Sequence, residues 1–216
     1  MSLIELIEGP LWTFSATLFV IFVFWRLISI LDLRRRGASP KPQGSRLAGA
    51  LRALLVRFVP RPPFTRSGRV WFTTVAGYAF HLGLFVLLLA AVPHVEFIER
   101  RIAALPWEPI SRTGFVIAAE ISFLGLIMLY TRRFVDPLVR RINRPDDHVA
   151  SLLTFIVMLT GCMALGRQSA FLRGLHMGFV ELWLIYFPFS SLMHTFTWPI
   201  SRLVTGWEAG RRAVRW

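Results

Sequence analysis

Five apolar runs dominate the chain, and short polar stretches separate them. They cover approximately residues 11–31, 70–92, 113–131, 149–165 and 175–198. A helix of about 20 apolar residues crosses the roughly 30 Å of hydrocarbon in a bilayer. The pattern therefore predicts an all-α integral membrane protein, a five-helix bundle that forms a single membrane domain over residues 1–216.

Composition supports this class and excludes others. Of the 216 residues, 55% are hydrophobic, and the mean hydropathy is +0.55, which is too apolar for a disordered chain or an ordinary soluble domain. The single cysteine, Cys162, excludes a disulfide framework and an iron–sulfur or zinc site of the chain's own. No cleavable signal is expected at the N-terminus, because Met1 to Pro10 has no basic residue.

The basic residues define an orientation. Segments 32–70, 132–148 and 199–216 together carry nineteen Arg and Lys, whereas 1–10, 94–112 and 167–173 carry five. This positive-inside pattern predicts an outside (periplasmic) N-terminus and a cytoplasmic C-terminus. It also explains the net charge of +13 without a nucleic-acid partner.

Residues 32–69 are expected to form a cytoplasmic linker followed by an amphipathic helix. Pro40, Pro42 and Gly44 mark the linker. Apolar residues then recur at helical spacing, with arginines between them: Leu47, Leu51, Leu54, Leu55 and Phe58, with Arg46, Arg52 and Arg57. Such a helix lies on the inner membrane surface and binds anionic lipid, or it provides a docking surface for a cytoplasmic subunit.

Four histidines fall at two predicted depths in the membrane. His81 and His194 lie near the cytoplasmic side, and His94 and His176 near the outer side. An ionisable group in hydrocarbon is costly and tends to be functional, and paired imidazoles on facing helices are usual axial ligands of b-type haem. The sequence thus predicts an inner haem site at His81 and His194 and a weaker outer site at His176 and His94.

The spacing of the two C-terminal histidines supports this interpretation. His176 and His194 are 18 residues apart, which in one continuous helix is about 27 Å and five whole turns, so both would point the same way. His94 shares a face with His81 only if Pro93 bends the chain; otherwise it caps the helix end. His148 is interpreted as a neighbour of a helix N-cap and not as a ligand.

At these residues the chain resembles the gamma subunit of respiratory nitrate reductase, a five-span dihaem cytochrome b. It is similar also to the membrane subunits of heterodisulfide-reductase-like and sulfite-reductase-linked complexes. The likeness rests on Trp25-Arg26, Phe80-His81-Leu82-Gly83, Arg132-Arg133-Phe134, Pro137, His176, Phe187-Pro188-Phe189-Ser190, Leu192-Met193-His194 and Pro199. It implies that His81 and His194 hold the inner haem and that His176 holds the outer one.

The chain departs from that family at the remaining ligand of the outer haem. The resemblance implies a histidine ten residues after His81, where this chain has Ala91. Either His94 substitutes for it, or the outer haem is absent and the protein carries one haem. The family's outer lysine, associated with quinol binding, also has no match, and Trp107 to Arg112 occupies that neighbourhood.

Three further charged residues fall within the predicted spans. Glu120 and Glu181 each lie seven residues from the outer start of a span, and we expect them to handle quinone and its protons. The alternative is that each bonds a hydroxyl, or pairs with Arg112 or Arg173. Arg26 either snorkels to the interface or neutralises a propionate of the inner haem.

The expected function is electron transfer between the quinone pool and an iron–sulfur subunit on the cytoplasmic side, in a bacterial inner membrane. The chain would be a quinone-reactive subunit of a respiratory oxidoreductase and not a complete enzyme. Two alternatives remain open. One is a proton- or ion-coupled transporter that uses Glu120 and Glu181, and the other is a scaffold subunit without a cofactor.

Overall fold

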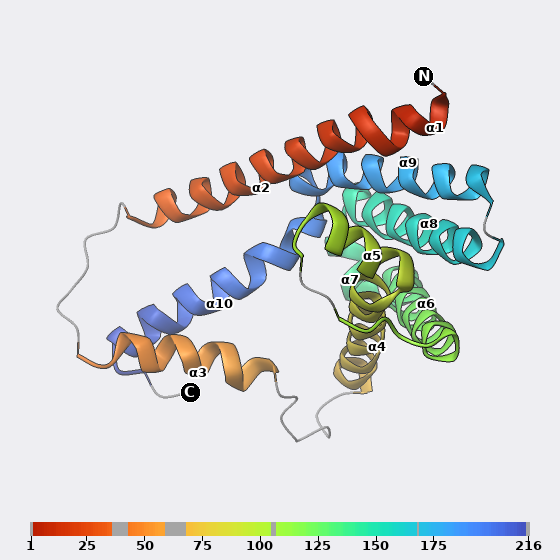
Figure 1. Ribbon diagram of the computed structural model, residues 1–216. Helices are drawn as coiled ribbons and strands as arrows, with labels where there is room; N and C mark the ends of the chain where they lie inside the picture. Colours follow the sequence, from red (N-terminus) through yellow and green to blue (C-terminus); the bar gives the residue numbers. More distant parts are fainter. Residues whose placement is uncertain (1, 36–42, 59–67, 105–106, 168, 215–216) are drawn as a thin grey trace. The chain divides into compact units, whose positions relative to one another are not determined.

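The computed structural model describes residues 2–35, 43–58, 68–104, 107–167 and 169–214, and the regular structure in these ranges is helical throughout (Figure 1). The predicted linker residues Pro40 and Pro42 lie outside the described residues. The helices are α1 (Leu3–Leu6), the π-helix η1 (Ile7–Leu11), α2 (Trp12–Arg35), α3 (Arg46–Phe58), α4 (Gly68–Ala90), α5 (Val92–Arg101), α6 (Arg112–Val135), α7 (Pro137–Ile142), α8 (Pro145–Arg167), α9 (Ala170–Tyr186), the 3₁₀ turns η2 (Phe187–Phe189) and η3 (Ser191–Met193), and α10 (His194–Arg211).

Five helical stretches in the described residues are long and apolar enough to cross a membrane. They are Leu3–Leu31, Gly68–Ala90, Arg112–Val135, Pro145–Leu165 and Ala170–Phe189. This confirms the predicted all-helical fold with five candidate spans, as expected of a multi-pass membrane protein.

The fifth span differs from the prediction at both ends. Its helix begins at Ala170 instead of Leu175, and it ends at Tyr186 instead of continuing to Trp198. Pro188 follows at once and has no amide hydrogen with which to extend the helix, while Ser190 takes extended backbone angles (φ −110°, ψ 175°). One continuous helix through His176 and His194 was therefore a wrong prediction, and the five-turn argument for their common direction does not hold.

The chain divides into two compact units. Unit 1 contains residues 1–9 and 64–183, which include α4 to α8 and most of α9. Unit 2 contains residues 10–63 and 184–216, which include α2, α3 and α10. Each unit is described by itself.

Unit 1 is built around a close pair of helices, α4 and α6. Each contributes a glycine at which the other's backbone approaches. A Cβ on Gly83 would lie 2.7 Å from the carbonyl oxygen of Ala118, and one on Gly125 would lie 2.5 Å from the amide nitrogen of Phe80. The hydroxyl of Ser122 also donates to the carbonyl of Phe80 at 3.0 Å. Small residues at a helix contact are typical of membrane helix pairs, because van der Waals packing drives their association.

Asp136 turns the chain between α6 and α7. Burial raises the pKa of its carboxyl, but hydrogen bonds from the amides of Leu138 and Val139 and the charges of Arg69 and Arg132 outweigh that effect and hold the pKa below its ordinary value. The carboxylate accepts from the Leu138 amide at 3.0 Å and pairs with Arg69 at 3.3 Å. Asp136 thus caps α7 and ties the corner to the start of α4.

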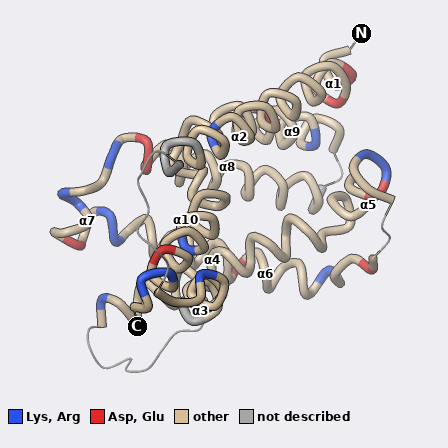
Figure 2. The backbone as a smooth tube through the Cα atoms, turned by 90° about the vertical axis from the view of Figure 1, so that its left-hand side faces the viewer, with Lys and Arg blue, Asp and Glu red and all other residues tan. Residues whose placement is uncertain are grey.

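The charged residues of unit 1 gather at the two ends of its long helices, around α5 at one end and around α7 at the other (Figure 2). The lengths between these ends are mostly uncharged. Two polar layers with an apolar middle are the distribution expected of a helix bundle in a bilayer.

In unit 2, the segment expected to form an amphipathic helix is helical as α3, and α3 packs against α10. The contact is made through small residues, since a Cβ on Gly49 would lie 2.3 Å from the carbonyl oxygen of Gly206. Three leucines of α3, Leu47, Leu51 and Leu55, are exposed. Small residues of α3 are thus used in the fold, whereas these three leucines are not covered by it.

Aromatic side chains connect α2 to the interrupted segment that follows α9. The rings of Phe19 and Phe187 meet edge to face with centroids 5.3 Å apart, and those of Phe22 and Phe189 lie 4.9 Å apart. Phe187 also contacts Phe196 of α10 at 5.7 Å. These edge and tilted contacts hold the 3₁₀ turns after α9 against α2.

The α4–α6 contact gives a first prediction. Gly125→Ala places a methyl group against the backbone of α4, and we expect it to destabilise the fold by about 1–3 kcal/mol. A lower melting temperature of the detergent-solubilised chain would report this loss. Gly68→Ala is the control, because a Cβ on Gly68 meets nothing within 4 Å. Equal melting temperatures for the two variants would contradict the packing argument.

Candidate functional site

The chain bends sharply where α4 ends. Ala91 has extended backbone angles (φ −68°, ψ 136°), and α5 starts after it with Pro93 in its first turn. Proline has no amide hydrogen and fits the first turn of a helix but not its interior. The bend that the outer histidine pair requires is therefore present, and it redirects His94.

The broken helix leaves backbone carbonyls at the end of α4 without helical partners, and two groups from the following loop satisfy them. The indole nitrogen of Trp107 donates to the carbonyl of Leu89 at 2.7 Å, and the amide of Ile110 donates to the carbonyl of Ala90 at 2.7 Å. Unpaired carbonyls are costly in an apolar environment, so these bonds fix the loop against the helix end.

His94 and His176 lie side by side within unit 1. Their ring centroids are 6.1 Å apart and their planes are inclined by 29°. The Nδ1 atom of His94 lies 2.8 Å from the carbonyl oxygen of Leu87. Because a carbonyl only accepts, this Nδ1 carries the hydrogen, and the lone pair of the neutral ring is on Nε2.

The same tautomer, with the hydrogen on Nδ1, is assigned to His176. The hydroxyl of Thr160 donates to carbonyls of its own helix, those of Ile156 at 2.8 Å and Val157 at 3.1 Å. Its oxygen therefore accepts from Nδ1 of His176, 3.3 Å away, and the ring's lone pair is again on Nε2. Gly161 makes room for this ring, since a Cβ there would lie 3.0 Å from its Cε1 atom.

The chemistry of these two donors suits a metal-holding role, in which each ring would offer its Nε2 atom. Histidines that bind metals donate their second ring N–H to an oxygen, which fixes the tautomer and the ring's orientation. The two ring centroids lie 6.1 Å apart and both rings have the lone pair on Nε2, so they form one candidate ligand pair.

His81 and His194 belong to different units, His81 to unit 1 and His194 to unit 2. Each has its Nδ1 atom 2.7 Å from a backbone carbonyl oxygen, that of Gly77 for His81 and that of Ser191 for His194. The tautomer is therefore the same as in the outer pair. The inner pair stays a prediction.

A cleft of about 680 Å³ opens beside the end of α4, between α6 and α8. Glu120 and Arg112 give its wall one carboxylate and one guanidinium, and Ala91 and Cys162 also line it. The other lining residues are apolar: Val92, Ile110, Phe115, Val116, Ala119, Phe123 and Leu165. Glu120 was predicted from the sequence to be a site residue. Cys162 was not, because its immediate neighbours, Gly161 and Met163, gave no signal of a site.

Glu181 is not part of this cleft. Its side chain is buried, and neither carboxylate oxygen has a hydrogen-bond partner in the part of the chain that the structure describes. The predicted span began at Leu175, which makes Glu181 its seventh residue. The helix begins at Ala170 instead, so Glu181 is its twelfth residue. Glu181 therefore lies about 16 Å along its helix, and Glu120 lies about 12 Å along α6.

Arg26, predicted either to snorkel or to meet a haem propionate, is exposed on α2. It has no ion pair with a carboxylate among the described residues. Both interpretations of Arg26 stay predictions.

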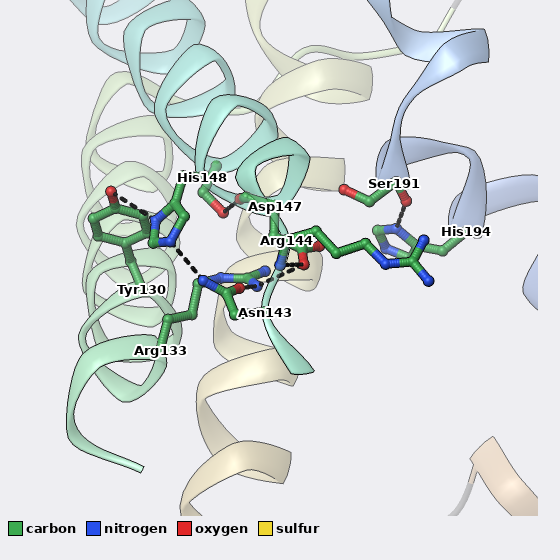
Figure 3. A network of polar contacts seen from close by, with 9 residues as sticks. Tyr130, Arg133, Asn143, Arg144, Asp147, His148, Ser191 and His194 are labelled. Carbon is green, nitrogen blue, oxygen red and sulfur yellow. Dashed lines mark hydrogen bonds and ion pairs between the residues drawn. The ribbon is translucent and has the colours of Figure 1, made fainter. Parts of the chain in front are cut away.

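A polar network that the sequence did not predict connects α6, α7 and α8 (Figure 3). His148 meets Asn143 through Nε2 at 2.5 Å and the hydroxyl of Tyr130 through Nδ1 at 3.3 Å. Arg133 donates to Asn143 Oδ1 at 2.6 Å and lies 3.6 Å from the carboxylate of Asp147. The sequence does contain a signal for the helix boundaries in this region, the dipeptides Asp136-Pro137 and Arg144-Pro145. Each marks a helix start, so together they delimit the short α7.

No protein-family model matches this chain. The chain is similar to a protein of Nitratidesulfovibrio vulgaris (strain Hildenborough), and the two are 29% identical over 208 residues, which cover 91% of this chain and 88% of that protein. The relative is described only as "Protein", so this similarity indicates no activity.

Proposed function

We propose that this chain is a membrane b-type cytochrome subunit that transfers electrons between the quinone pool and an iron–sulfur subunit of a respiratory oxidoreductase. The resemblance to the gamma subunit family of respiratory nitrate reductase, and to its heterodisulfide-reductase-like and sulfite-reductase-linked relatives, is part of this proposal. The observation that carries it is the pairing of His94 with His176 inside a helical unit that can span a membrane.

The histidine pair supports haem binding for an energetic reason. His176 lies within a candidate span, where an imidazole is costly and tends to be functional, and His94 lies just past the end of another span. Each ring of this pair is oriented by a bond at Nδ1, to Leu87 for His94 and to Thr160 for His176, so that Nε2 carries the lone pair a metal needs. In the proposal these two residues hold the outer haem, and His94 replaces the histidine that the family has where this chain has Ala91.

The inner haem is proposed to be held by His81 and His194, whose Nδ1 atoms are oriented in the same way. When bound, haem accepts and donates single electrons, which the side chains of this chain do not do. The protein's own part is to hold the ligands in one tautomer and to keep the site apolar.

The cleft that contains Glu120 and Arg112 is the proposed quinone site. Quinol oxidation releases protons, and the carboxylate of Glu120 is the one acceptor for them among the cleft's described lining residues. The guanidinium of Arg112 donates hydrogen bonds and is suited to a quinone oxygen. Glu181, buried at greater depth, is proposed to hold a proton and not to contact quinone.

Charge supports the proposed orientation and is compatible with the proposed partner. With the α7 end of unit 1 in the cytoplasm, the arginine-rich segments face the inside of a bacterial inner membrane. The exposed leucines of α3 would then lie on the lipid surface, and its arginines would face the headgroups or an acidic iron–sulfur partner. The proposal includes no nucleic acid.

The first test is haem stoichiometry. Pyridine haemochrome quantitation of the purified chain should give two b haems, or one if a pair is unused. His94→Ala or His176→Ala should remove the outer haem and leave the inner one. His81→Ala or His194→Ala should remove the inner haem and leave the outer one. Each pair is the control for the other. A chain that carries no haem, or whose haem content survives all four substitutions, would refute the proposal.

The second test concerns the cleft. Glu120→Gln keeps the shape of the side chain but removes the proton acceptor, so we expect haem reduction by decylubiquinol to slow at least about tenfold. The control is Glu99→Gln, which changes an exposed glutamate of α5 outside the cleft. Stopped-flow absorbance of the haem band measures both rates. An unchanged rate in Glu120→Gln would remove Glu120 from the proposed mechanism.

A further inference from the structure

The helices α3 and α10 pack against each other in unit 2, and neither is among the candidate spans (Figure 1). With 13 residues, α3 is about 20 Å long and too short to cross a bilayer. The 18 residues of α10 include Pro199, Arg202 and Glu208. A charged helix pair of this length is suited to water or to a membrane surface and not to the hydrocarbon layer.

The contact with α10 fixes the direction of the apolar side of α3. Gly49 of α3 is the residue that Gly206 of α10 approaches. At about 100° per residue, Leu47 and Leu51 lie roughly 160° around the helix from Gly49, and Leu55 lies roughly 120° from it. Leu47 is 61% exposed and Leu55 63%. The three leucines therefore point away from α10, and the pairing of the two helices holds them in that direction.

Arginines flank the three leucines on both sides. Arg46 lies about 100° around the helix from Leu47, and Arg52 lies about 60° from Leu55 in the opposite direction. Arg52 is exposed, and the guanidinium of Arg46 lies over the ring of Trp207, 5.8 Å from its centroid. Basic side chains in these positions extend from an apolar layer toward the phosphates above it.

The charge of the segment favours an anionic surface. Residues 33–95 contain no Asp or Glu, whereas residues 34–69 carry ten Arg and Lys. Glu208, the acidic residue of α10, forms an ion pair with Arg211 at 2.7 Å. Basic clusters beside membrane spans are attracted to anionic headgroups. An acidic protein surface would neutralise the arginines but would bring polar groups against the leucines, whereas a bilayer offers headgroups and hydrocarbon at adjacent depths.

We propose that α3 is a binding surface for anionic phospholipid of the inner leaflet, with α10 covering its opposite side. The three exposed leucines enter the acyl region, and Arg46 and Arg52 contact headgroup phosphates. The proposal rests on the orientation proposed above and names lipid, not an acidic protein, as the partner of α3. It does not involve haem.

Fluorescence quenching in nanodiscs tests where the leucines lie. Leu51→Cys, in a Cys162→Ser background of the full-length chain, carries a bimane label. The nanodiscs contain phosphatidylcholine and an increasing fraction of phosphatidylglycerol, with 5-doxyl phosphatidylcholine as the quencher, and matched discs without doxyl lipid give the reference. Quenching by doxyl lipid should rise with the phosphatidylglycerol fraction. The control is Thr205→Cys, an exposed position of α10 about 100° around the helix from Gly206, whose label should instead be quenched by iodide from the water.

The role of the arginines is tested in the same labelled chain. Arg52→Gln removes one exposed charge, so at a given phosphatidylglycerol fraction the ratio of inserted to withdrawn α3 should fall about fivefold, as expected for one basic residue at an anionic surface. Arg52→Lys keeps the charge and should restore the quenching.

A Leu51 label that iodide quenches and doxyl lipid does not, at every phosphatidylglycerol fraction, would overturn the proposal and leave the leucines to a protein partner. Doxyl quenching that is independent of phosphatidylglycerol and unchanged by Arg52→Gln would overturn the assignment of anionic headgroups. The haem spectrum of the same nanodiscs reports the cytochrome proposal separately, because a chain without haem can still place α3 in lipid.

Discussion

The candidate outer site depends on how α4 ends. Pro93 prevents the helix from continuing, and the chain turns at Ala91 before α5 begins. The carbonyls left at the helix end are paired with Trp107 and Ile110. If the helix had continued past Ala90, it would have carried His94 away from the face that meets α9. The position of His94 beside His176 therefore depends on Pro93, which has no amide hydrogen with which to continue α4.

The same constraint, that polar groups in an apolar layer need partners within the protein, orders the rest of unit 1. It fixes the tautomers of His94 and His176 through oxygens of Leu87 and Thr160. At the charged α7 end, Arg133 donates to Asn143, and His148 contacts both Asn143 and the hydroxyl of Tyr130. Glu181 is the exception, because its buried carboxylate has no partner among the described residues. Such an exception in a membrane span is typical of functional groups.

Hydropathy predicted the number and the type of the spans because length and apolar composition are sufficient for that purpose. It did not predict where the last span ends, since Phe187, Pro188 and Phe189 are as apolar as a helix interior although Pro188 ends the helix. The start of this helix was not predicted either, because it extends back from Leu175 to Ala170 through a segment that contains Arg173 and lowers the mean hydropathy. The side-chain network of Tyr130, Asn143 and His148 lay beyond prediction, because it joins three helices whose packing the sequence does not state.

The outer haem of the proposed cytochrome depends on whether His94 and His176 ligate its iron, and a ligand exchange tests this most directly. Replacing a histidine ligand by methionine raises the reduction potential of a haem. In a spectroelectrochemical titration of the His94→Met chain, the account predicts that the potential of one b haem rises while that of the other stays constant. Potentials and spectra identical to those of the unaltered chain would contradict it.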